Sequence, residues 1–166
     1  MHKLVVSTAL AVTLLAAPLF AQTPESVVPG QAVGGIRLGG NIDEAVNMLG
    51  ELVDKSERGS YMVYDWPLRP LLVIAEKDSG KIVLVLVQLN DAYRTERAIT
   101  AGSDRQAVEK AYGKGFLSDE NQRSTTLIYD ELGIAFDIGK LGVMQDKVTS
   151  IFVFMPGQWK KITADL

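Results

Sequence analysis

The chain contains no cysteine, and its only histidine is His2. His2 lies in a segment that we expect to be removed as a signal peptide, so the mature chain is expected to contain neither residue type. The Ser-His-Asp and Cys-His catalytic systems need an imidazole base, and the usual zinc and copper sites need imidazole or thiolate ligands. Disulfides and a lipid anchor on cysteine are excluded as well. We therefore expect no enzyme, no catalytic residues, no metal and no cofactor. Stability must come from apolar burial.

A continuous stretch of basic residues is also missing. The formal net charge is -3, and the acidic and basic residues are interspersed along the chain. Binding to a phosphate backbone requires clustered Lys and Arg. Nucleic acid is therefore not an expected partner.

Residues 1–21 have the features of a signal peptide. A short basic start at Met1-His2-Lys3 precedes the apolar run Leu4 to Ala17, and Pro18 to Ala21 provides a break and a small residue. Pro18 interrupts the run before it reaches the ~20 apolar residues of a membrane-spanning helix. We expect cleavage near Ala21, a periplasmic or secreted protein, and no stable membrane anchor.

The rest of the chain shows an internal repeat. Gly39-Gly40-Asn41 followed by Gly50 recurs as Gly102-Ser103-Asp104 followed by Gly113. Similarity at a fixed period is typical of repeated supersecondary units. Asn41 and Asp104 are suitable N-caps for a helix, and a glycine ends each helix. The pattern predicts a helix of about two turns in each copy, too short to be stable alone.

Apolar and aromatic runs bounded by turn residues predict three strands after each helix. The fold class expected is α+β, with two tandem modules that each pack a short helix on a three-stranded antiparallel sheet. The strands are predicted at residues 61–66, 71–76 and 81–89, and at 123–130, 133–138 and 147–154.

The domain division follows from these elements. We expect an extended leader at 22–35, a first module at 36–90, a polar linker at 91–98, a second module at 99–155 and a C-terminal tail at 156–166. A single module of this size would be marginally stable. The two modules are therefore expected to pack as one unit with their sheets side by side.

A family resemblance follows from the helix motif. Residues 36–50 show Ile-x-Leu-Gly-x-Asn-x-x-Glu with a closing Gly, and residues 99–113 show a looser version. With three strands following, this resembles the exported α+β repeat modules of the β-lactamase inhibitor protein family and of the SmpA/OmlA lipoproteins of outer-membrane assembly. The resemblance implies an exported protein-binding scaffold. The disulfides of the first group and the lipidated cysteine of the second are absent, and no contact residues are carried over.

Several side chains are candidates for binding. Trp66 and Arg69 lie in a proline-flanked loop suited to recognition, although an equally weighted alternative has the Trp in the core. Tyr61, and Trp159 in the tail, are further aromatic candidates, and Trp159 either docks the tail or contacts a partner. Period-two alternation favours Tyr64 and Tyr129 on the core face. It turns the acidic residues that follow them, Asp65 and Asp130, toward solvent or a partner.

Two paired carboxylates are the signature of glycoside hydrolysis, and Asp65 and Asp130 are candidates for such a pair. The sequence specifies no distance between them, and two solvated acids at strand ends is the favoured interpretation.

Taken together, these features predict an exported non-enzymatic protein-binding scaffold of the cell envelope, with an envelope or extracellular protein as its partner. The alternative is a carrier for a lipid or a cell-wall-derived small ligand. That alternative is motivated by the apolar excess between Leu71 and Leu89.

Overall fold

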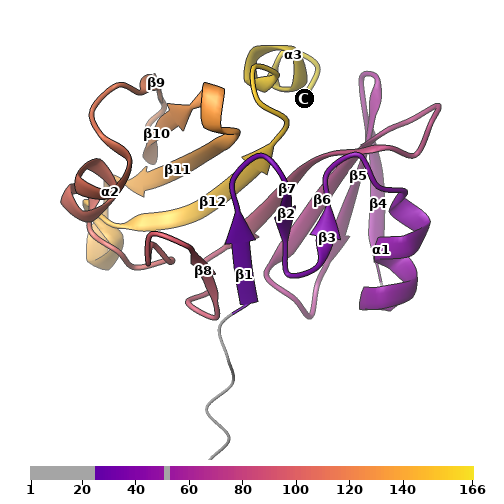
Figure 1. Cartoon of the computed structure of the whole chain (residues 1–166), viewed down its shortest axis with the longest axis horizontal. Helices are drawn as coiled ribbons and strands as arrows, with labels where there is room; N and C mark the ends of the chain where they lie inside the picture. The colour runs from indigo at the N-terminus through magenta and orange to yellow at the C-terminus, as the bar shows by residue number, and fades with distance from the viewer. Residues whose placement is uncertain (1–24, 51–52) are drawn as a thin grey trace, which may run out of the picture.

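The computed structural model of the chain describes residues 25–50 and 53–166 (Figure 1). The expected signal peptide lies outside the described residues. Within the described part of the chain, no helix is both long and apolar enough to span a bilayer.

The main feature is an eight-stranded antiparallel sheet with the order β4-β5-β6-β7-β12-β11-β10-β9. The central pair is β7 and β12, in register from Ser150 opposite Gln88 to Phe154 opposite Leu84. Six consecutive positions of β7 are buried, as expected for a strand covered on both faces. The strands are β4 (Asp54–Arg58), β5 (Tyr61–Trp66), β6 (Leu71–Glu76), β7 (Ile82–Gln88), β9 (Leu117–Glu120), β10 (Ser124–Tyr129), β11 (Ile134–Gly139) and β12 (Val148–Phe154).

A second sheet, of four short strands, packs on one face of the first (Figure 1). Its order is β3-β2-β1-β8, and β1 pairs with β8 in parallel. Val27, Val33 and Ile36 of this small sheet join the same buried cluster as Val85 and Ile151 of the large one. The strands are β1 (Glu25–Val28), β2 (Ala32–Val33), β3 (Ile36–Arg37) and β8 (Tyr93–Thr95).

Two short helices complete the layer on this face, and both begin and end at the predicted residues. Helix α1 (Ile42–Leu49) begins after Asn41, whose Oδ1 accepts a hydrogen bond from the Asp43 amide at 2.9 Å. Helix α2 (Arg105–Tyr112) begins after Asp104, whose side chain makes no capping hydrogen bond. Gly50 and Gly113 follow the two helices with φ of 100° and 88°, where a side chain would be strained.

Aromatic side chains of the large sheet hold the ends of both helices. Trp66 Nε1 donates to the carbonyl of Gly50 at 3.0 Å, and the Tyr129 hydroxyl donates to the carbonyl of Gly113 at 2.8 Å. Both side chains are buried. Each bond satisfies a carbonyl that a helix end leaves without an intrahelical partner.

The predicted architecture of two modules with three strands each is wrong. The pairing of β7 with β12 makes one continuous sheet, and β4 and β9 add a strand at each edge. The segment expected as an extended leader contributes β1 and β2, and the segment expected as a linker contributes β8. The described chain is mostly β, with only three short α-helices, α3 (Trp159–Thr163) being the last, and two 3-10 turns, η1 (Asp130–Leu132) and η2 (Gly142–Met144).

The physical reason for this error lies in strands that have no apolar alternation. All five residues of β4 are exposed, and four of them are charged. All four residues of β9 are exposed as well. Such strands are held by backbone pairing with a neighbour, so a pattern of buried side chains cannot reveal them.

Candidate binding groove

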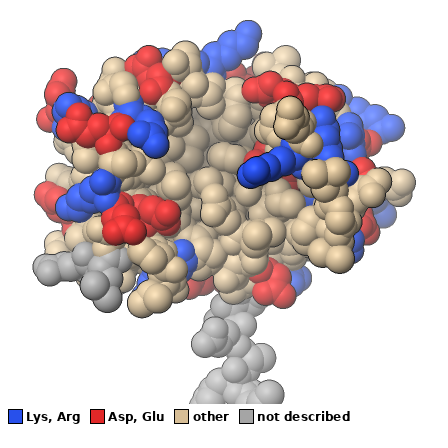
Figure 2. Space-filling view, turned by 180° about the vertical axis from the view of Figure 1, so that it is seen from behind, with Lys and Arg blue, Asp and Glu red and all other residues tan. Residues whose placement is uncertain are grey.

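The opposite face of the large sheet is only partly covered. Helix α3 packs there through Trp159 and Ile162, in a second buried cluster with Leu84 and Phe154. Beside the helix the sheet is open, and Figure 2 shows uncharged surface in the middle of this face with charged side chains gathered toward its two sides. A groove of about 470 Å³ lies here. Its lining comprises Asp54, Lys55, Ser56, Arg58, Val63, Asp65, Leu72, Ile74, Leu84, Leu86, Phe152, Trp159, Thr163 and Leu166.

The floor of the groove consists of two ladder rows that change from apolar to polar toward β4. One row runs across the sheet through Phe154, Leu84, Ile74, Val63 and Ser56. The neighbouring row runs through Phe152, Leu86, Leu72, Asp65 and Asp54. Because side chains two residues apart in a strand share a face, both rows lie on the groove face of the sheet. All their members line the groove except Phe154, which is buried beneath Trp159.

One wall of the groove is the C-terminal segment. The Trp159 ring lies 5.4 Å from that of Phe152, edge to face, and 5.0 Å from that of Phe154. The Trp159 amide donates to Asp130 Oδ1 at 3.2 Å, and Ser60 Oγ donates to Asp165 Oδ2 at 2.8 Å. These contacts attach the start of α3 and the end of the chain to opposite parts of the large sheet.

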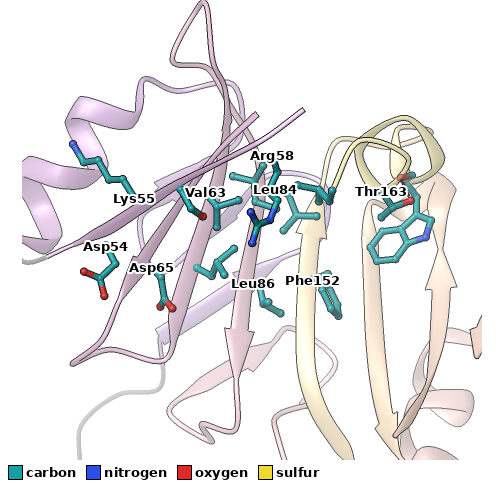
Figure 3. A pocket seen from close by; sticks show the side chains of 14 residues that line it. Asp54, Lys55, Arg58, Val63, Asp65, Leu84, Leu86, Phe152 and Thr163 are labelled. Atoms are coloured by element: carbon teal, nitrogen blue, oxygen red, sulfur yellow. Dashed lines mark hydrogen bonds between the residues drawn. The ribbon is translucent and has the colours of Figure 1, made fainter. Parts of the chain in front are cut away.

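The rim at the β4 side carries charge. Figure 3 shows Asp54 and Asp65 close together at one end of the groove, while the side chain of Lys55 points away from it. Lys55 Nζ lies instead 5.3 Å from the Tyr64 ring. Asp54 and Asp65 are directly opposite each other on β4 and β5. Neither forms an ion pair among the described residues.

The six candidate residues of the sequence fall in different places. Asp65 and Trp159 both line the groove, Asp65 at its rim and Trp159 in its wall. Asp130 lies behind that wall, where its carboxylate accepts the Trp159 amide.

The remaining three candidates lie outside the groove. Trp66 is 2% exposed and holds the end of α1, and Tyr61 is 4% exposed beneath the C-terminal segment. Arg69 is exposed in the turn between β5 and β6. The alternation that placed Tyr129 on the core face is confirmed, since this side chain is 5% exposed.

The structure separates Asp65 from Asp130. Between β5 and β10 lie β6, β7, β12 and β11. With strands about 4.8 Å apart, the five spacings amount to about 24 Å along the sheet. Paired catalytic carboxylates of glycosidases are about 5–10 Å apart, so these two residues do not form such a pair.

The floor residues Leu72, Leu84, Leu86 and Phe152 were not among the candidates. The apolar run at residues 82–87 was a signal, because it indicated a strand covered on both faces. What covers each face is decided by the tertiary structure, with α3 on the groove side and the small sheet on the other. Among the described residues no group of three or more His, Cys, Asp or Glu side chains gathers as a metal site would require. The arrangement is suited to burying an apolar group beside a charged rim.

Comparison with known proteins gives information on the fold alone. No protein-family model matches the sequence, and no curated protein is significantly similar to it. A cysteine-rich secretory protein from Staphylococcus aureus has a similar structure, with a TM-score of 0.50 and 16% identity over 87% of this chain and 50% of that one. An extracellular protein from Bacillus anthracis that contains an SCP domain gives a TM-score of 0.48 and 10% identity over 91% of this chain and 50% of that one.

This chain therefore spans about half the length of each of those proteins. The resemblance to the β-lactamase inhibitor protein and SmpA/OmlA modules is wrong. No family model matches the sequence, and the fold is similar to that of a cysteine-rich secretory protein instead. The motif at residues 36–50 describes a capped helix entering a sheet, which unrelated folds share.

Proposed function

We propose that this is an exported, non-catalytic binding protein whose groove holds an apolar segment of an envelope or extracellular protein. The observation that carries the proposal is the open groove beside α3, which is lined by apolar side chains of four neighbouring strands, with Val63, Leu72 and Phe152 only half-buried. Contiguous apolar surface of this kind is typical of interaction sites. The signal-peptide features of residues 1–21 support export, as do the secretory and extracellular proteins of similar fold.

The groove also suggests what the segment looks like. Its floor accepts aliphatic or aromatic side chains between Leu72, Leu86 and Phe152. Asp65 ends the apolar row at the rim, without a cation partner among the described residues. A segment with a Lys or Arg next to its apolar side chains would therefore match both the floor and the rim.

The test is site-specific photo-cross-linking in the native host. A photoreactive residue replaces Thr163 in the groove wall, and the same protein is prepared with Leu72→Glu, which places a charge in the half-buried floor. Val143→Glu is the matched control, because Val143 is 91% exposed and lies outside the groove. We expect one protein adduct that Leu72→Glu abolishes and Val143→Glu retains. An adduct equally strong in both variants would show that the groove is not the site.

A carrier of a lipid or cell-wall fragment is the second candidate. A groove of about 470 Å³ is within the usual range of small-molecule sites. Native mass spectrometry of the purified protein separates the two functions. A bound amphiphile that is lost with Leu72→Glu would favour the carrier, and a ligand-free protein that still cross-links would favour the protein partner.

A further inference from the structure

Strand β4 is an edge of the large sheet, and its residues are all exposed. One side of its backbone pairs with β5. The other side has no strand partner among the described residues. An open edge of this kind is a template for pairing with another chain.

The residues of β4 are complementary in charge to a second copy of the same strand. They read Asp54-Lys55-Ser56-Glu57-Arg58. If two copies run antiparallel about a two-fold axis at Ser56, Asp54 faces the partner's Arg58 and Lys55 faces the partner's Glu57. Opposite charges then meet at every charged position, and cross-strand pairs of this type stabilise a sheet.

The complementarity holds on both faces of the strand. Asp54, Ser56 and Arg58 lie on the groove face of β4, and Lys55 and Glu57 alternate with them along the strand. Glu57 already accepts from Lys77 Nζ at 2.6 Å, so the partner's Lys55 would bring a second cation to it. The pairing also relieves a local repulsion, because Asp54 stands directly opposite Asp65 within one chain.

The other edge of the sheet has no such property. Strand β9 reads Leu117-Ser118-Asp119-Glu120 and contains no basic residue. Self-pairing there would oppose Leu117 to Glu120 and Ser118 to Asp119. Charged residues can protect an edge strand from association without being complementary to a second copy of that strand. The acidic residues of β9 are of this kind.

We propose that two copies of this chain associate through antiparallel pairing of β4, with Ser56 on the two-fold axis. Such an isologous interface closes after two subunits. The sheet continues from one copy into the other, and both grooves open on the same face. The partner's Arg58 then joins the rim of each groove beside Asp54. This inference does not depend on the proposed binding activity.

Sedimentation equilibrium of wild type, Asp54→Arg and Arg58→Asp tests the proposal. We expect a wild-type dimer, and a dissociation constant raised about tenfold or more in each variant, because each change places like charges at both symmetric pairs. An equimolar mixture of the two variants should form a heterodimer, since every Arg then faces an Asp. The double variant D54R/R58D should dimerise like wild type for the same reason.

Asp119→Arg on β9 is the matched control and should leave the wild-type association unchanged. A monomeric wild type at every concentration would overturn the proposal. A dimer that both single variants leave intact, or variants whose mixture stays monomeric, would also overturn it. Because both sites are exposed, circular dichroism of the single variants is expected to match wild type, and groove cross-linking reports separately on the proposed function.

Discussion

Asp137 carries a carboxyl group whose surroundings favour its neutral form. It points from β11 to the face of the large sheet that also carries the groove, and Thr126 Oγ1 donates to its Oδ1 at 2.5 Å. Burial raises the pKa of Asp137 and the nearby Asp119 charge adds to this, while the Thr126 hydrogen bond opposes both. Ionisation of Asp137 at neutral pH is therefore less favourable in the folded protein than in the unfolded chain.

This predicts a pH-dependent effect of Asp137→Asn. Because the folded pKa lies above the unfolded value, the folded state binds more protons as the pH falls through that pKa, and wild type gains stability in this range. The Asn variant cannot gain it, and at pH 7 it avoids burying a charge. We expect Asp137→Asn to be more stable relative to wild type at pH 7 than at pH 4. Urea unfolding at both pH values measures this, and a difference independent of pH would contradict it.

Single residues also show what the alternation of side chains along a strand predicts and what it does not. It correctly placed Tyr129 in the core. It could not distinguish the two interpretations of Trp66, because the outcome depends on the Gly50 carbonyl that this indole reaches across the fold. Asp130 illustrates the same limit. Its role in holding α3 depends on a segment 29 positions further along the chain.

At the scale of elements, Gly133 joins the two sheets. It follows η1 with a φ of 68°, and its carbonyl accepts the Gly30 amide at 3.1 Å. A Cβ at this position would lie 2.2 Å from the Phe154 carbonyl oxygen and 2.7 Å from Gly30 Cα. Both neighbours are backbone atoms, so they cannot move without displacing β12 or the turn after β1.

We therefore expect Gly133→Ala to destabilise the protein by about 3 kcal/mol or to prevent folding, because it adds this clash to left-handed backbone strain. Gly157→Ala is the control. Gly157 has a φ of 74°, and a methyl group added there would meet no other atom within 4 Å, so only the strain of about 1 kcal/mol applies. Thermal unfolding of both variants measures the difference. Equal losses would show that the close approach is unimportant.

The elements differ in how well a sequence predicts them. Strands β5 and β6 were predicted with the observed bounds, since both contain apolar or aromatic runs between clear turns. β4 and β8 were missed because they consist largely of polar residues, and pairing with β5 and β1 makes them strands. The groove shares this limit. Its apolar floor is visible in the sequence, whereas its rim lies on β4 and its wall on α3.

At the scale of the whole molecule, the central strands β7 and β12 join the two halves of the large sheet, β4 to β7 and β12 to β9. Each half therefore depends on the other for stability. β7 is followed in the sheet by β12, and the second buried cluster combines residues of β6 and β7 with Phe154, Trp159 and Ile162. Separating the halves would expose the apolar β7 on a face and along an edge.

We expect a fragment of residues 25–98 to remain unfolded or to aggregate, although it contains the whole first predicted module. Far-UV circular dichroism and size-exclusion chromatography of the fragment measure this, with the chain from residue 25 to 166 as the control. A monomeric fragment that unfolds cooperatively would contradict the expectation and would indicate an independent unit.

The sequence by itself determined the local structure: two short helices that end at glycines, and six strands with apolar runs. These properties depend on residues that are close in the sequence, so hydrophobic periodicity and the signals at helix ends predict them directly. The tertiary structure alone decided that β7 pairs with β12, that polar segments become edge strands, and that the C-terminal segment forms a groove wall. Those outcomes depend on contacts between distant residues and on backbone hydrogen bonds, which leave no period in the sequence.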